Sequence, residues 1–131
     1  MDKTDLKILE HLQTNAKLSM VELGDRVNLT QTPCARRVQN LESNGVIEQY
    51  VTLLNHKQVG LAVNAFVELS LKREDAKVVP EFESGLAQFP EVMECYALSG
   101  GHDYLIRVVA PDLDAYHSFL KEKLLTLRGV E

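Results

Sequence analysis

The side chains best suited to chemistry in the first half of the chain lie in one stretch, TQTPCARRVQNLESNG, from Thr30 to Gly45. Thr30 can cap the start of a helix, Pro33 is tolerated in its first turn, and Gly45 stands where a helix can end in a left-handed residue. At about 100° per residue, an apolar line falls on one side of this helix and a polar line on the other. The polar side holds Thr32, Arg36, Gln39, Asn40 and Ser43.

This polar face carries the side chain types that proteins use on nucleic acids. Arg, Asn, Gln, Ser and Thr form hydrogen bonds with base edges and phosphates, and no acidic residue stands among them. A solvated helix face is the plainer interpretation, and this helix alone does not decide between the two. The apolar line of Cys34, Val38 and Leu41 must face a core in either case.

A second cluster, Gly100-Gly101-His102-Asp103, admits three interpretations. His102 with Asp103 and Tyr104 could make a small acid–base set. The two glycines could expose backbone N–H groups to a carboxylate while Asp103 accepts from an ammonium group, which suits an amino acid. The third interpretation is a plain hairpin turn between two strands.

Other catalytic and metal-binding patterns are absent from the sequence. It contains no nucleophile elbow, paired-carboxylate motif or P-loop. Cys34 and Cys95 share no close spacing, so we expect two reduced, packed thiols. The histidines form no metal-ligand spacing with cysteines or carboxylates: His11, His56, His102 and His117. We therefore expect no catalytic residue, no metal and no cofactor beyond a small ligand.

Three helices are predicted before residue 45. Thr4 can cap the first, whose buried face would comprise Ile8, Leu9, Leu12 and Ala16. Ser19 and Glu22 form a capping box that opens a second helix ending near Val27. A short helix, a tight turn and a third helix make a helix-turn-helix, which leaves the outer side of the third free to enter a major groove. Residues 46–54 alternate like a strand that can pair locally as a wing.

The second half is predicted to alternate strands and helices as β-α-β-β-α. The strands are expected over 65–71, 92–99 and 104–110, with helices over about 80–89 and after the cap Asp112. This order is one strand short of the ferredoxin-like β-α-β-β-α-β unit. Helices would cover one sheet face, and the half-apolar other face favours dimerisation. That face would include Phe66, Glu68, Met93 or Tyr96, Arg107 and Val109.

The net charge of −5 over 131 residues is unevenly distributed. Residues 1–57 hold seven Lys/Arg and seven Asp/Glu, whereas residues 58–131 hold seven against twelve. The acidic second half argues against nucleic-acid binding there, and the neutral first half permits it only through a local patch. No apolar run is long enough to span a bilayer and the N-terminus is not a signal peptide, so we expect a cytoplasmic protein with no membrane partner.

Four segments, in this order, resemble the Lrp/AsnC family, also called feast/famine regulators, and its leucine-responsive type in particular. They are DKTDLKILEHLQ, MVELGDRVNLTQTPCARRVQNLESNGVI, LSGGHDYLIR and PDLDAY, and the resemblance covers residues 2–131. It implies an N-terminal winged helix-turn-helix and a C-terminal ferredoxin-like domain that dimerises and binds amino acids. Family dimers often assemble into octamers that wrap DNA.

The resemblance also implies roles for particular residues. With Ser43 added from the polar face, the expected DNA-binding residues are Ser19, Gln31, Thr32, Pro33, Arg36, Arg37, Gln39, Asn40 and Ser43. The family's effector loop, a glycine with an aspartate three residues on, corresponds to Gly100 and Asp103. Their neighbours complete the expected effector-binding set: Leu98, Ser99, Gly101, His102 and Tyr104.

The resemblance departs from the family at the C-terminal end. Members usually extend further and supply the last strand of the sheet, whereas this sequence ends at Glu131, where that strand should begin. We therefore expect a ferredoxin-like domain lacking most of its last strand. The resulting open sheet edge would weaken the dimer and could abolish higher assembly or the effector response.

The sequence thus predicts an α+β protein with a winged helix-turn-helix domain at 1–52, a linker at 53–63 and a ferredoxin-like effector and dimerisation domain at 64–131. The expected function is sequence-specific binding of double-stranded DNA by a transcriptional regulator, not an enzyme, of the bacterial or archaeal nucleoid. The effector would be an amino acid such as leucine, and the protein a homodimer or a larger oligomer such as an octamer. The alternative is an amino-acid-binding module with weak or architectural DNA binding. Target genes and the sign of regulation are not encoded in these motifs.

Overall fold

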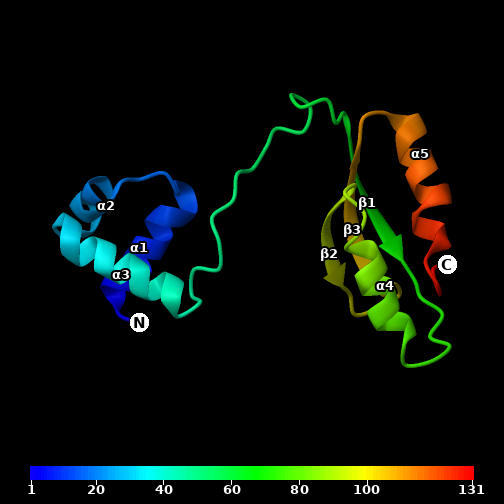
Figure 1. Cartoon of the computed structure of the whole chain (residues 1–131), viewed down its shortest axis with the longest axis horizontal. Coiled ribbons are helices and arrows are strands. Elements are labelled where there is room, and N and C mark those ends of the chain that lie inside the picture. Colours follow the sequence, from blue (N-terminus) through cyan, green and yellow to red (C-terminus); the bar gives the residue numbers. More distant parts are fainter. The chain divides into compact units, whose positions relative to one another are not determined.

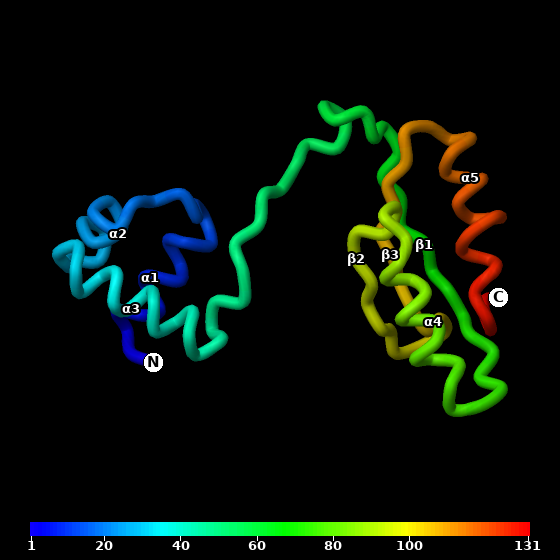
Figure 2. Tube along the Cα trace, in the orientation of Figure 1, coloured from blue at the N-terminus to red at the C-terminus, as the bar shows by residue number.

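The computed structural model describes all 131 residues, and they form two compact units, residues 1–53 and 54–131. Each unit has its own apolar core. Between Ser43 and Val63 the chain contains no helix or strand, as the tube in Figure 2 shows.

The first unit consists of α1 (Lys3–Thr14), α2 (Met20–Val27) and α3 (Gln31–Ser43) (Figure 1), which confirms the predicted order of three helices. Their apolar sides meet in one cluster, which comprises Ile8, Leu12, Leu18, Leu23, Val27, Cys34, Val38 and Leu41. Ala16 is exposed rather than buried, because α1 ends at Thr14 and the chain turns there.

The helix ends follow local capping chemistry, with one correction. Asp2, not Thr4, caps α1, because its Oδ1 accepts a hydrogen bond from the Asp5 backbone N–H at 2.9 Å. The predicted capping box of Ser19 and Glu22 opens α2, with both hydrogen bonds at 3.1 Å. Thr30 occupies the cap position of α3 without a side-chain hydrogen bond, and Gly45 follows that helix in the left-handed region with φ of 76°.

The turn between α2 and α3 depends on a close approach at Gly24. Its carbonyl accepts a hydrogen bond from the Leu29 N–H at 2.8 Å, and Asn28 adopts a left-handed φ of 60° to make the turn. A Cβ at Gly24 would lie only 2.3 Å from the Leu29 carbonyl oxygen. The absence of a side chain therefore lets α3 begin immediately against α2.

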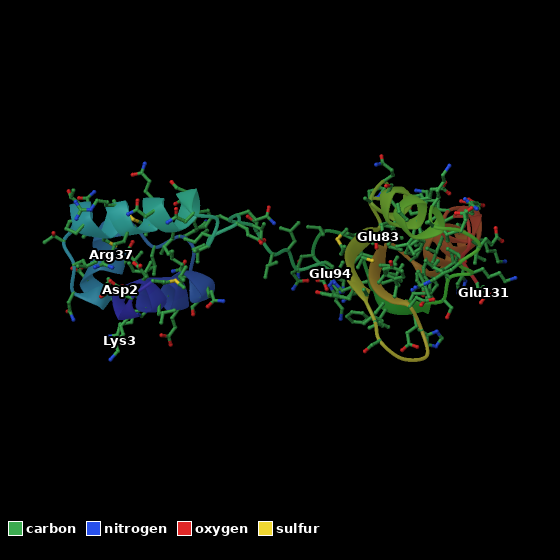
Figure 3. The ribbon with its side chains drawn as sticks, turned by 90° about the horizontal axis from the view of Figure 1, so that it is seen from below. Asp2, Lys3, Arg37, Glu83, Glu94 and Glu131 are labelled. Carbon is green, nitrogen blue, oxygen red and sulfur yellow. The ribbon has the colours of Figure 1, made fainter.

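Arg37 fastens the flank of α3 to the start of α1. Its Nη1 lies 2.8 Å from an Asp2 carboxylate oxygen and 3.1 Å from Asp5 Oδ1, and Figure 3 labels Asp2 and Arg37 in this unit. The Arg37 hydrogen bond is the main cause that holds the pKa of Asp2 below its usual range, followed by the Asp5 backbone N–H. Asp2 therefore caps one helix and binds another with the same carboxylate.

The wing strand expected over residues 46–54 is not formed. The N–H groups of Val46 and Ile47 both donate to the Leu41 carbonyl, at 3.0 and 3.1 Å, which folds the chain back against the end of α3. No other strand lies in the first unit, so the alternating residues that follow have no ladder to join. Several of their apolar side chains are exposed, Leu53 at 90%.

The second unit contains β1 (Val63–Leu69), α4 (Val78–Leu86), β2 (Val92–Ala97), β3 (Tyr104–Ala110) and α5 (Leu113–Glu122), followed by the 3-10 turn η1 (Leu124–Thr126) (Figure 1). The strands form an antiparallel sheet in the order β1-β3-β2. This confirms the predicted β-α-β-β-α unit, although α4 ends at Leu86 rather than Phe89. Asp112 caps α5 as predicted, accepting from the Ala115 N–H at 2.7 Å.

Both helices pack on one face of the sheet. The Phe82 and Tyr104 rings lie 4.9 Å apart, and the Phe89 and Phe119 rings 5.6 Å apart, so side chains from both helical regions meet the strands in one core. Phe66, on the other face of β1, is 61% exposed.

The structure decides between the two β2 alternatives for the open sheet face and shows that one expected residue of that face is covered. A register irregularity between Val92 and Glu94 places Met93 with Cys95 in a cavity beneath α4, so Tyr96 is the apolar β2 residue of the open face. Val109 lies on the expected face, opposite Asn64 and two residues from Arg107, but it is buried at 4% exposure.

The last residues of the chain return to the end of β1. Leu71 and Val130 form an antiparallel bridge, the Lys72 N–H donates to Gly129 O at 2.8 Å, and the Glu131 N–H donates to Ser70 O at 3.0 Å. The sheet therefore has three full strands, and the last residues add one bridge beside the end of β1.

Replacing Gly24 with alanine is expected to destabilise the first unit by about 1–3 kcal/mol or more, because the new methyl group would collide with backbone that cannot move without shifting α3. Chemical denaturation followed by circular dichroism measures the change. Gly101→Ala is the matched control, since a Cβ there meets nothing within 4 Å. Equal stability of the two variants would contradict the close approach described here.

Replacing Asp2 with asparagine keeps a good capping residue but removes the charge that binds Arg37. Because the pKa of Asp2 is lowered in the folded state, its contribution to stability is present above the usual aspartate range and is lost as the pH falls through the folded value. Wild type should melt at a higher temperature than Asp2→Asn near pH 7, and the difference should shrink as the pH falls below the usual aspartate range. Glu10→Gln, at an exposed position without an ion pair, should show no such pH dependence.

Candidate functional site

The outer face of α3 presents polar side chains that have no partner within the protein. Thr32, Arg36, Gln39, Asn40 and Ser43 are exposed, and none forms a side-chain hydrogen bond or ion pair. The opposite side is buried, with Cys34 at 0% exposure and Val38 and Leu41 at 5% each. The helix is therefore held by its apolar side, and its hydrogen-bonding groups are free for another molecule.

The two adjacent arginines of α3 have different surroundings. Arg36 points to the exposed side and has no carboxylate partner, whereas Arg37 lies on the flank and is bound by Asp2 and Asp5. Hydrogen bonds to these two carboxylates raise the pKa of Arg37, that to Asp2 the most. Arg36 is thus the unpaired cation on this helix.

A groove of about 400 Å³ continues the polar face of α3 toward the start of α1. Arg36, Asn40 and Asn44 line it, one helical turn apart from each other, together with Met1. Asn44 was not among the residues expected from the sequence. The signal that could have found it is its spacing, four residues beyond Asn40 on the same side of the helix.

The remaining expected DNA-binding residues lie at helix starts. Ser19 caps α2 with its Oγ as acceptor from the Glu22 backbone N–H, and a hydrogen bond from its side chain helps to lower the pKa of Glu22. Gln31, Thr32 and Pro33 make up the first turn of α3. Backbone N–H groups in a first turn have no partner within the helix, and Gln31 and Thr32 supply two of them at the positive end of the helix dipole. Such a helix start binds anionic oxygens, phosphates included.

Gly100 to Asp103 form the turn between β2 and β3, as the hairpin interpretation predicted. The Leu98 N–H donates to Asp103 O, and the Asp103 N–H donates to Leu69 O, each at 2.8 Å. Gly100 has a φ of 121°, a conformation that favours glycine. The backbone N–H groups of residues 99–102 form no hydrogen bond within the chain. The loop is therefore both a turn and a row of free donors.

Asp103 is not a free acceptor in this loop. Its Oδ2 accepts from the Leu71 backbone N–H at 2.8 Å, and its Oδ1 accepts from Arg73 Nη2 at 3.1 Å. Sequence reasoning missed Arg73, because the charged stretch 72–77 gave no sign of which residue returns to the loop.

The acid–base set that His102, Asp103 and Tyr104 could have made is not assembled. The His102 ring lies with Nε2 3.0 Å from a Glu68 carboxylate oxygen and with Nδ1 3.2 Å from Ser70 Oγ. Tyr104 faces the helices, where its hydroxyl donates to Glu83 Oε1 at 2.7 Å. Burial, with Glu83 as a further cause, raises the pKa of Tyr104 to about 12.

The cysteines form neither a reactive thiol nor part of a metal centre. Cys34 is buried, but Cys95 is exposed rather than packed, because it lies on the edge strand beside the cavity beneath α4. Burial raises the pKa of both thiols. No group of three metal-binding side chains comes together, and no helix has the length and apolarity to cross a membrane.

Comparison with known proteins covers both units. Residues 64–131 match the Lrp/AsnC ligand binding domain, and residues 1–48 match a winged helix-turn-helix DNA-binding domain. The chain is 41% identical to the leucine-responsive regulatory protein of Klebsiella pneumoniae and 40% identical to that of Escherichia coli K12. Each match covers 99% of this chain and 79% of the relative.

Solved structures agree with these matches. A Neisseria meningitidis transcriptional regulator in complex with L-methionine superposes with a TM-score of 0.95 at 39% identity, over 100% of this chain and 84% of that one. An AsnC family transcriptional regulator from Agrobacterium tumefaciens superposes with a TM-score of 0.90 at 39% identity, over 100% of this chain and 87% of that one. The unpaired polar helix, the βαββα unit and these matches together show that the chain belongs to the Lrp/AsnC family of transcriptional regulators, a family of DNA-binding and ligand-binding proteins rather than enzymes.

Proposed function

We propose that this regulator binds a specific double-stranded DNA site through α3 and answers to a free amino acid such as leucine or methionine. The observation that supports DNA binding is the outer face of α3, where exposed polar side chains have no partner in the protein. The names of the relatives support the effector half, since one group is leucine-responsive and a structural neighbour holds L-methionine.

The proposed DNA contacts form two groups, one with base edges and one with phosphates. Arg36, Gln39 and Asn40 have the length and the paired donors or acceptors that bind base edges. Ser19, Gln31, Thr32, Ser43 and Asn44 are placed to bind phosphates, together with the free N–H groups of the first turn, while Pro33 fixes the shape of that turn. Arg37 serves this interface by fastening α3 to α1.

The effector contacts fall on the loop from Leu98 to Tyr104. Its free backbone N–H groups at residues 99–102 suit a carboxylate, and the Asp103 carboxylate suits an ammonium group. Gly100 and Gly101 leave room for a ligand to approach the backbone, since a Cβ at either would meet nothing within 4 Å. The division of labour is then a DNA-binding domain at 1–52, a linker at 53–63 and an effector and dimerisation domain at 64–131.

The open face of the sheet is the proposed contact with a second copy of the chain. Phe66 and Tyr96 are 61% and 51% exposed on it. Arg107 lies between them and is already paired, with Nε 3.2 Å from Glu94 Oε1 and Nη1 3.1 Å from Asn64 Oδ1. Apolar rings around a satisfied polar centre can be covered without leaving a charge unpaired.

A dimer would present two copies of α3 to two half-sites of a pseudo-palindrome. Assembly of dimers into octamers is the corresponding proposal for larger forms. Because its partner is the chromosome, we place the protein at the nucleoid of a bacterial or archaeal cell.

Arg36→Ala is expected to weaken binding to a cognate duplex by about 1–3 kcal/mol, which is roughly ten- to a hundredfold, without loss of fold. The duplex is obtained by repeated selection from a random pool with the full chain, and binding is titrated by fluorescence anisotropy at several salt concentrations. Lys7→Ala, which removes the same charge from α1, is the control. Equal losses for both variants, or no loss for Arg36→Ala, would exclude Arg36 as a specific contact.

Phe66→Glu is expected to shift the protein from dimer to monomer, because the open face would then bury an unpaired charge against its own copy. Sedimentation equilibrium measures the association. Leu113→Glu, at a side chain of α5 that is 62% exposed on the helical side, should leave it unchanged. A Phe66→Glu protein that still dimerises would show that another surface joins the subunits.

A further inference from the structure

The effector loop contains an internal ion pair whose two halves carry the charges of an amino acid. Arg73 Nη2 lies 3.1 Å from Asp103 Oδ1, and the two side chains are 63% and 30% exposed. The pair is open to solvent, so it opens at little cost. A ligand that offers both charges can therefore compete with it.

The two members of the pair are held unequally. Asp103 is fixed by a second bond, in which its Oδ2 accepts from the Leu71 backbone N–H at 2.8 Å. Arg73 has no other partner, and one of its five N–H donors is in use. Asp103 would therefore stay in place when the pair opens, whereas the guanidinium can move to a new acceptor.

The other basic side chains near the loop contact other carboxylates, not Asp103. Lys72 Nζ lies 3.5 Å from a Glu131 carboxylate oxygen, and His102 Nε2 lies 3.0 Å from a Glu68 carboxylate oxygen. Arg73 is thus the basic side chain in direct contact with the carboxylate of the loop. The free N–H groups of residues 99–102 lie in the same loop as that carboxylate.

We propose that Arg73 is the residue that makes the site specific for a free amino acid, by an exchange of ion pairs. The ligand's carboxylate takes the place of Asp103 on the Arg73 guanidinium, and its ammonium group takes the place of Arg73 on Asp103 Oδ1. Two ion pairs replace one, and no charge is left unpaired. The inference rests on the proposed amino-acid effector and adds the residue that requires its carboxylate.

The test compares three ligands of one shape by calorimetry on the full chain: L-leucine, L-leucinamide, which lacks the carboxylate, and 4-methylpentanoate, which lacks the ammonium group. Wild type should prefer leucine over each analogue by about tenfold or more, since each lacks one charged hydrogen-bonding group. R73Q should lose most of the preference for leucine over leucinamide, with only the backbone N–H groups left to bind the carboxylate, yet still prefer leucine over 4-methylpentanoate, because Asp103 remains. R73K should recover part of the preference for the carboxylate.

K77Q is the matched control, since Lys77 belongs to the same charged stretch and forms no ion pair. It should bind all three ligands as wild type does. A merely structural role for Arg73 would weaken all three ligands by one factor, and that result, or unchanged leucine binding by R73Q, would overturn the proposal. Failure of wild type to bind any amino acid would instead overturn the effector half of the proposed function and this inference with it, while leaving the DNA titrations unaffected.

Discussion

The burial of one side of α3 is the interaction on which the helical unit depends. Cys34, Val38 and Leu41 are sealed against α1 and α2, and burial of a Val or Leu side chain contributes about 1.5–3 kcal/mol each. This burial stabilises α3 even though the polar groups on its other side form no hydrogen bond within the protein. The outer face of α3 can therefore remain unsatisfied until DNA supplies the missing partners, which is the condition that a recognition helix must meet.

Orientation of that helix comes from contacts that contribute little energy. The close approach of Gly24 to Leu29 sets the distance between α2 and α3. The ion pairs of Arg37 with Asp2 and Asp5 set how the side of α3 that carries Arg37 lies against the start of α1. Exposed ion pairs contribute little to stability, yet bonds to two carboxylates restrict where a side chain and its helix can lie. The core thus supplies the stability of the interface, and a few small contacts supply its geometry.

Periodicity and capping predicted most of the fold, because both act over a few neighbouring residues. The three helices, the three strands and the caps at Ser19 and Asp112 all follow from such local patterns. Prediction failed where a partner distant in sequence decides the outcome. Residues 46–54 alternate like a strand but find no ladder, and Asp2 rather than Thr4 caps α1 in a position that also suits Arg37.

The same limit explains what the sequence could and could not say about the two sites. Helical spacing separates Arg36 from the buried side, but it cannot show that Arg37 meets Asp2 and Asp5 some 35 and 32 residues away in the chain. Glycine spacing predicts a turn with free N–H groups, but not that Arg73 returns to Asp103. Charges seek partners across the fold, so their roles are decided by tertiary structure.

Electrostatics also explains why the DNA-binding surface must be local. The whole deficit of five charges lies in residues 58–131, and that part would repel a phosphate backbone, whereas residues 1–57 are neutral as a group. Attraction to DNA must then come from the few unpaired donors of α3, not from a broad basic field. A surface with so little bulk charge gains little from non-specific contacts, since those depend on phosphate neutralisation by Lys and Arg. Discrimination among sequences is favoured as a result, because a larger share of the binding energy has to come from contacts with base edges.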